Sequence, residues 1–446
     1  MSGHRVIADV HYRGVVSAVA VATRKLFHPD TPVRLRLWSG LVICTAVALL
    51  AATGLLLSRV QDQVRIIGGQ AAPQAATAAD LYFVLSDLDS QVTRMVLVGD
   101  SAELSGSQLD ALGTYQQCSR QADEDLQRSL TTATSSADRA IVLELMHHLA
   151  VYRRWVWQTR TAQSQAPPQP PGRLPPDALG YYTQATNVLH LDLLPGAERL
   201  RAAGESRLGR AYADKRSTEL AAVVLALLLG GALVVLLVIL QVWLARRFRR
   251  MLNPALALAT VLTLGLTAGV CLVLVTQGQR LGAARDDNLT PFLALSQARA
   301  LSYDAAADTS RYLLSGNQDL YQRDFTGKSG RLSAAAAELD SSGQMLDRWQ
   351  GYQRDHQRVV ALAAAGRTGA AVYAITGIRR GDAAFDFSYY DASAGAAAET
   401  RKAGFDAALR DGERLLTGWP LIPLPVLGAV ILLVLLGVRK RLAEYR

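Results

Sequence analysis

Four long stretches of this 446-residue chain contain no Asp, Glu, Lys, Arg or His. They cover residues 37–58, 220–245, 251–279 and 415–438. A bilayer core of about 30 Å needs about 20 helical residues at a rise of 1.5 Å each, so every stretch is long enough to cross a membrane. A buried helix of a soluble protein rarely continues this far without a polar face. The sequence therefore predicts an all-α integral membrane protein with transmembrane helices at 37–58, 220–245, 252–276 and 418–438.

The excess of basic over acidic charge lies in three short segments outside these stretches. Residues 1–36 contain six Lys or Arg, and the basic residues of the other two segments are Arg246, Arg247, Arg249, Arg250, Arg439, Lys440, Arg441 and Arg446. Short cytoplasmic segments carry an excess of Lys and Arg. This rule places the N-terminal segment 1–36, the loop 246–251 and the tail 439–446 in the cytoplasm, and residues 59–219 and 277–417 outside the cell. The net charge of +9 thus reflects topology and contact with anionic lipids, and not nucleic-acid binding.

The chain has the layout of one unit repeated in tandem, because each extracytoplasmic segment lies between two spans. An offset of 217 residues aligns Asp87 with Asp304 and Arg94 with Arg311. Few other identities survive, so the shared layout supports a tandem duplication more than the residues do.

Both extracytoplasmic segments have the composition of helices, rich in Ala, Leu, Gln, Arg and Glu. The first predicts helices at 59–98, 107–132 and 135–165, then a Pro-rich loop over 166–176 and a fourth helix from Asp177 with a kink at Pro195. The second predicts helices at 287–315, 319–339 and 344–365, then a broken helical stretch over 368–416. Each segment is thus expected to form a four-helix-bundle-like domain.

One charged cluster stands out in the second segment. Asp304, Asp308 and Arg311 are spaced i, i+4 and i+7, so they share one face of a helix. The cluster is either a structural ion pair between bundle helices or a contact for a charged ligand or a partner protein. The candidate ligand- or partner-binding residues are Asp87, Arg94, Asp304, Asp308, Arg311 and Tyr312.

Two other motifs are weak. Residues 326–329 read Thr-Gly-Lys-Ser, the end of a phosphate-binding loop, but that loop needs another glycine where this chain has Gln322, and a preceding strand. Glu144 and His148 are one helical turn apart and could ligate a metal, but no third ligand is evident. Cys118 is the only cysteine outside the predicted spans, so the chain has no cysteine cluster for a metal or a disulfide. We expect no metal, no cofactor and no catalytic residues.

A two-span, four-helix sensor module resembles the ligand domains of bacterial chemoreceptors, and the whole chain resembles the GlnX-type membrane proteins of actinobacteria. The resemblance rests on the four-span layout and on four short stretches, 181–185, 193–197, 295–304 and 310–314. It implies a signalling intermediary between an extracytoplasmic amino-acid-binding lipoprotein and a cytoplasmic Ser/Thr kinase. The Pro-rich loop departs from the pattern expected of the family.

The division of the chain between the two sides of the membrane leads to the same class of function. Its cytoplasmic pieces are too short to fold into a catalytic domain, so any output has to pass through a partner. The basic residues of the loop 246–251 and of the tail are the candidate contacts for that partner or for anionic lipid. A homo-oligomer is compatible with this interpretation. An envelope scaffold or an accessory subunit of a transport system is the alternative, although spans without charged residues are unusual in transporters.

Overall fold

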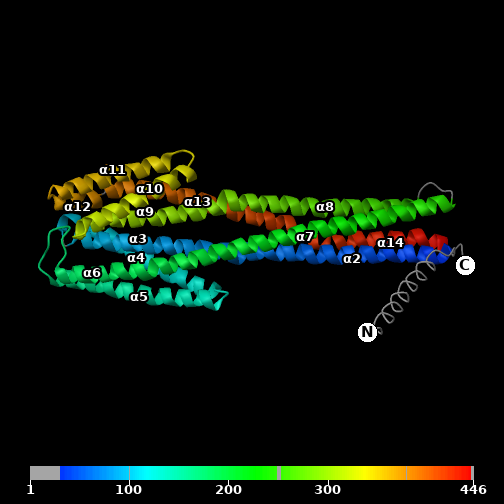
Figure 1. The fold of residues 1–446 in the computed structure, drawn as a ribbon, viewed down its shortest axis with the longest axis horizontal. Helices are drawn as coiled ribbons and strands as arrows, with labels where there is room; N and C mark the ends of the chain where they lie inside the picture. The colour runs from blue at the N-terminus through cyan, green and yellow to red at the C-terminus, as the bar shows by residue number, and fades with distance from the viewer. Residues whose placement is uncertain (1–30, 100, 249–252, 378, 443–446) are drawn as a thin grey trace, which may run out of the picture. The chain divides into compact units, whose positions relative to one another are not determined.

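The computed structural model describes residues 31–99, 101–248, 253–377 and 379–442. Within these ranges all regular structure is helical (Figure 1), which confirms the all-α prediction. By their contacts the residues cluster into two compact units. The span unit consists of residues up to 62, 216–278 and the residues from 414 onward. The bundle unit consists of residues 63–215 and 279–413.

The described residues contain four helical stretches long and apolar enough to cross a membrane, as predicted. They are Arg36–Val98, Pro176–Arg246, Pro254–Leu314 and Ala383–Arg439. Their apolar parts belong to helices α2 (Thr31–Ile66), α7 (Leu194–Phe248), α8 (Pro254–Ala284) and α14 (Pro423–Leu442). This arrangement indicates a multi-pass membrane protein.

The surface of the span unit is what a bilayer requires. Each of the four helices has at least one large aliphatic side chain that is more than 60% exposed; examples are Leu55, Leu228, Val261 and Leu432. In water such exposure would be costly, whereas hydrocarbon solvates these side chains well. Between the helices small residues permit close contact, since a Cβ added at Gly230 of α7 would overlap the side chain of Thr267 on α8.

The first segment of the bundle unit follows its local sequence signals. Gly99, with φ of +60°, ends α3, and the Ser135 side chain caps α5 by accepting a hydrogen bond from the Asp138 amide at 3.0 Å. The Pro-rich loop is held in place because the Gly172 amide donates to the Leu97 carbonyl at 2.9 Å. The helices are α3 (Ala72–Val98), α4 (Ser105–Thr132), α5 (Ser136–Gln165) and α6 (Pro176–Val188), which continues into α7.

The second segment contains the three predicted helices and the expected broken stretch. The break falls between α12 and α13, where Gly381 adopts a positive φ of +88°. The helices are α9 (Thr290–Leu314), α10 (Gln318–Leu339), α11 (Gln344–Ala364), α12 (Thr368–Thr376) and α13 (Ala383–Leu416).

The two segments pack on one another through α3 and α9, which lie side by side (Figure 1). The Phe83 ring of α3 meets the Tyr303 ring of α9 edge-on, with centroids 5.4 Å apart. Aliphatic side chains such as Leu81, Leu85 and Leu88 fill the first segment. The core of the second is aromatic, with Trp349 and Tyr352 fully buried. Segments predicted as separate bundles therefore form one compact unit.

Three π-helical turns interrupt the long helices of the bundle unit, at Ile67–Ala71, Leu189–Leu193 and Arg285–Leu289. A proline follows each turn two residues later: Pro73, Pro195 and Pro291. Proline has no amide hydrogen and clashes with the carbonyl four residues earlier, so the wider turn relieves a conflict inside a continuous helix. At Pro195 this turn takes the place of the predicted kink.

Candidate functional site

Arg311 of α9 is almost fully buried, with 1% of its surface exposed. Its Nη1 donates to Asp308 Oδ1 at 2.6 Å and to Asp304 Oδ1 at 3.3 Å. Its Nη2 donates to Oδ2 of Asp89, on α3 of the first segment. The shared face predicted for the α9 residues is therefore present, and the arginine also joins the two segments of the chain.

Lys328 of α10 completes this cluster. Its Nζ lies 2.6 Å from Oδ2 of Asp304 and 2.6 Å from Oδ2 of Asp308. We call Asp89, Asp304, Asp308, Arg311 and Lys328 the charge network; it contains three carboxyl groups and two cations. Ionised groups tolerate burial only when they are paired, and every member here has an opposite charge in contact.

The two α9 carboxyl groups respond differently to this environment. Burial alone would raise the pKa of Asp304, but Lys328 and Arg311 outweigh it and hold that pKa at about 2. Burial raises the pKa of Asp308 to about 6, against the pull of Arg311 and Lys328. The network holds one more carboxyl group than cations and therefore has an excess negative charge. As the pH falls, Asp308 takes up a proton before Asp304 does and removes that excess.

Hydroxyl and imidazole groups extend the network on both sides. On the first-segment side, Tyr152 of α5 donates to Asp89 Oδ1 at 3.4 Å. On the other side, the Thr309 hydroxyl lies 2.9 Å from His356 Nδ1 and accepts a hydrogen bond from Tyr352 at 3.3 Å. Burial lowers the pKa of His356 to about 4, so its ring is neutral at pH 7. Polar groups from α3, α5, α9, α10 and α11 thus meet in one interior region.

The counterparts in the first segment do not repeat this cluster. Asp87 is buried, accepts hydrogen bonds from Gln91 Nε2 at 2.7 Å and from Cys118 Sγ at 3.2 Å, and burial raises its pKa to about 6. Arg94 instead pairs with the exposed Asp110, 2.9 Å away. The structure therefore separates Asp87 from Arg94, although their alignment with Asp304 and Arg311 had suggested a second site.

The sequence alone did not indicate two members of the network, Asp89 and Lys328. Tyr312, the residue that follows Arg311, is buried at 7% exposure. Asp89 has no counterpart in the 217-residue offset, so no local signal marked it. Lys328 did carry a signal, because it lies three residues after Phe325 and four before Leu332, both buried on the inner face of α10.

The remaining basic candidates lie near the ends of the span-unit helices. Arg246 at the end of α7 and Arg439 in α14 are exposed. Arg247 lies within α7, and Lys440 and Arg441 within α14. Arg249 and Arg250 fall outside the described residues.

Neither weak motif forms a site. Gly327 and Lys328 lie inside α10 and not on a loop, so they cannot cradle a phosphate. His148 faces Glu144 with one ring nitrogen, at 3.7 Å, and Asp192 with the other, at 3.6 Å. The two acids cannot converge on one ion with that ring between them, and the described part of the chain holds no group of three or more metal-binding side chains.

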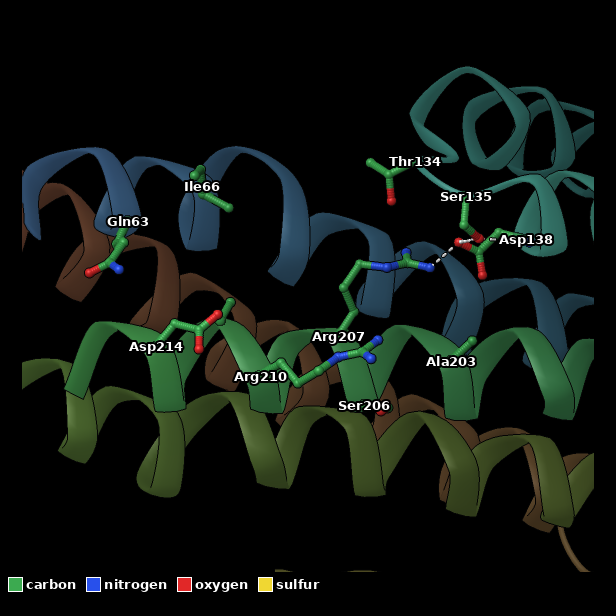
Figure 2. A pocket seen from close by; sticks show the side chains of 11 residues that line it. Gln63, Ile66, Thr134, Ser135, Asp138, Ala203, Ser206, Arg207, Arg210 and Asp214 are labelled. Carbon is green, nitrogen blue, oxygen red and sulfur yellow. Dashed lines mark hydrogen bonds and ion pairs between the residues drawn. The ribbon is translucent and has the colours of Figure 1, made fainter. Parts of the chain in front are cut away.

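The bundle unit also contains an open cleft of about 570 Å³ (Figure 2). Arg207 of α7 crosses it to pair with Asp138 at the start of α5, and donates to Gln74 Oε1 at 2.7 Å. Arg210, one turn further along α7, is exposed and lines the same cleft, with no ion pair to another described residue. The cleft is open enough to admit a small molecule. Its other lining residues are Gln63, Ile66, Thr134, Ser135, Ala203, Ser206, Ala211 and Asp214.

Residues 63–213 match the family model described as Actinobacterial sensor domain. The match covers α3 to α6 and the first part of α7, and it includes all but one of the residues that line the cleft. No curated protein matches the chain, and no solved structure matches it. The chain is thus a helical protein that carries a sensor domain together with four long apolar helices, and its resemblance to GlnX-type proteins stays a prediction.

Proposed function

We propose that the protein is a transmembrane sensor or adaptor that acts by binding and not by catalysis. The observation that carries this proposal is the sensor-domain match over 63–213 in a chain with four candidate membrane spans. A sensor domain supplies a receiving surface, and the cleft lined by Arg207 and Arg210 offers space for a ligand.

The charge network gives such a sensor a link between its two segments. Asp89 belongs to the matched domain, whereas Arg311 and Lys328 belong to the second segment. A ligand shifts a protein between two arrangements only by its difference in affinity for them, typically about 1–3 kcal/mol. Contacts that tie the domain to α9 and α10 allow that modest bias to reach the second segment.

The partners follow from the resemblance and from charge. We propose that residues 59–219 and 277–417 are extracytoplasmic and receive an amino-acid-binding lipoprotein, and that the basic residues of 246–251 and 439–446 contact a cytoplasmic Ser/Thr kinase. Anionic lipid headgroups would also attract these basic residues. An experiment therefore has to distinguish whether these basic residues dock the kinase or only anchor the protein to lipid.

The test uses cells that carry only a variant chain. Arg249→Gln with Arg250→Gln removes two charges and leaves Arg246 and Arg247 to hold the topology. Arg379→Gln with Arg380→Gln, an adjacent pair in the second segment, is the matched control. We expect the first variant to lower phosphorylation of the kinase's substrates severalfold at normal membrane abundance, and the control to leave phosphorylation unchanged.

Unchanged phosphorylation in the first variant would contradict the docking role of this loop. Cross-linking of intact cells followed by mass spectrometry then tests the wider proposal. A solute-binding lipoprotein and a kinase among the neighbours support a relay, whereas neighbours drawn only from envelope-assembly or transport proteins would favour the scaffold or accessory subunit instead.

A further inference from the structure

A second cleft, of about 330 Å³, lies between α5 and α6 beside the Pro-rich loop. It is within the matched sensor domain and separate from the residues of the charge network. Its volume is at the lower end of the range for small-molecule sites, about 300–1,000 Å³. A ligand that fits this space is therefore small, or is the end group of a larger molecule.

Two aromatic rings line this cleft. Trp157 of α5 is 66% exposed and Tyr181 of α6 is 37% exposed. Tyr181 is held in place because its ring stacks on Trp155, with centroids 5.9 Å apart and planes 22° from parallel. An exposed tryptophan in a cleft presents a face with negative electrostatic potential to whatever enters.

The polar side chains of the same cleft include both hydrogen-bond acceptors and the amide donors of Gln158 and Gln165. The Thr161 hydroxyl already donates its proton to the Trp157 carbonyl at 3.0 Å, so this hydroxyl can only accept a further hydrogen bond. Oε1 of Gln158 is buried and has no hydrogen-bond donor among the described residues. Asp177, in the first turn of α6, adds a carboxylate that can only accept. Because Gln158 Oε1 is buried, the exposed Asp177 is the acceptor on which the N–H groups of a ligand depend.

The charge of the cleft agrees with this set of acceptors. Of the described residues that line it, Asp177 is acidic and none is basic. We propose that this cleft binds an organic ammonium ion, either a small alkylammonium or the aminoalkyl end of a larger molecule. The cation lies over the face of Trp157, and its N–H groups donate to Asp177. This binding does not depend on the relay proposed above, because it is measured on the purified protein.

The test follows the resonance of Trp157 by ¹⁹F NMR in the full chain, labelled with 5-fluorotryptophan and solubilised in detergent. Trp157→Phe assigns that resonance. The probe is propylammonium chloride, and sodium chloride at equal ionic strength and 1-propanol are the controls for salt and for the alkyl chain. We expect a saturable shift with propylammonium in the millimolar range and no saturable shift with either control.

Two variants connect this shift to the proposed contacts. Asp177→Asn removes the carboxylate and should weaken propylammonium binding about tenfold or more, since a hydrogen bond to a charged group contributes that much. Asp319→Asn removes the corresponding first-turn acid of α10, outside the cleft, and should leave the affinity unchanged. A thermal melt of each variant checks that its fold is intact.

Three results would overturn the proposal. One is the absence of any saturable shift with propylammonium, and another is equal affinity in the Asp177→Asn variant. The third is an equal response to 1-propanol or to the neutral disaccharide cellobiose, which would assign the aromatic rings to an uncharged ligand.

Discussion

Replacing Arg311 with methionine removes the cation that three carboxyl groups share. Methionine has a similar length and fits irregular space, so the variant changes the charge more than the packing. Asp89 and Asp308 have side chains that are 2% exposed, and they would keep their burial without this partner. Lys328 remains beside Asp304 and Asp308, but it makes no ion pair with Asp89 among the described residues.

The size of the stability loss in Arg311→Met follows from the burial of the charges that remain. Removing one partner of a buried ion pair typically costs about 3–5 kcal/mol, because the remaining charge is desolvated and uncompensated. Taking about 4 kcal/mol, and about 2–4 °C for each kcal/mol in a large domain, the melting temperature should fall by roughly 8–16 °C. The loss should shrink at acid pH, where Asp308 can take up a proton in place of the missing cation.

Arg94→Met is the matched control, at the position aligned with Arg311 in the other half of the chain. Arg94 pairs with an Asp110 side chain that is 65% exposed, and such surface pairs contribute at most about 1 kcal/mol. Thermal unfolding of both variants in the same detergent, at pH 5 and pH 8, gives the comparison. Equal melting temperatures for Arg311→Met and the wild-type protein would refute the energetic role assigned to the network.

Two other predictions concern Asp87 and its neighbour. Burial raises the pKa of Asp87 from 3.8 to about 6, so the contribution of this residue to stability is complete below pH 3.8 and is lost as the pH rises through about 6. Asp87→Asn should therefore recover about 1–3 kcal/mol of unfolding free energy at pH 8, measured by denaturant unfolding. No gain at that pH would contradict the burial argument. Burial also raises the pKa of the Cys118 thiol. We expect a membrane-impermeant maleimide to modify Cys118 only after denaturation, but to modify a Pro168→Cys variant in intact cells, and labelling of that variant only in inverted vesicles would reverse the proposed orientation.

The helices could be predicted because their ends are marked locally. Gly99 ends α3 with a positive φ, Ser135 caps α5, and the prolines between 166 and 176 exclude a helix. The membrane spans were equally clear, because a run of more than 20 residues without charge has few other structural uses. These features depend on neighbours in the sequence, so they survive folding unchanged.

The composition of the charge network could not be predicted to the same extent. The spacing of Asp304, Asp308 and Arg311 indicated one helical face, but the partner of Arg311 on α3 is 222 residues away. The alignment of the two halves pointed to Asp87 and Arg94, yet Arg94 lies where a solvent-exposed acid is available. Which of several acids faces a buried arginine depends on how two helices pack, and helical spacing alone does not set that.

The contact between Asp89 and Arg311 limits how α3 and α9 can move. One residue along a helix axis corresponds to about 1.5 Å, so even a one-residue slip of α3 along α9 would take this desolvated pair out of hydrogen-bonding distance. Such a slip would leave the buried Asp89 carboxylate without its cation, at a cost of several kcal/mol, whereas Arg311 would keep Asp308 on its own helix. Movements that keep the pair intact leave α3 and α9 as a fixed axis and displace helices packed around them, such as α5, α6 or α11. In this protein, axial sliding between α3 and α9 is therefore strongly disfavoured.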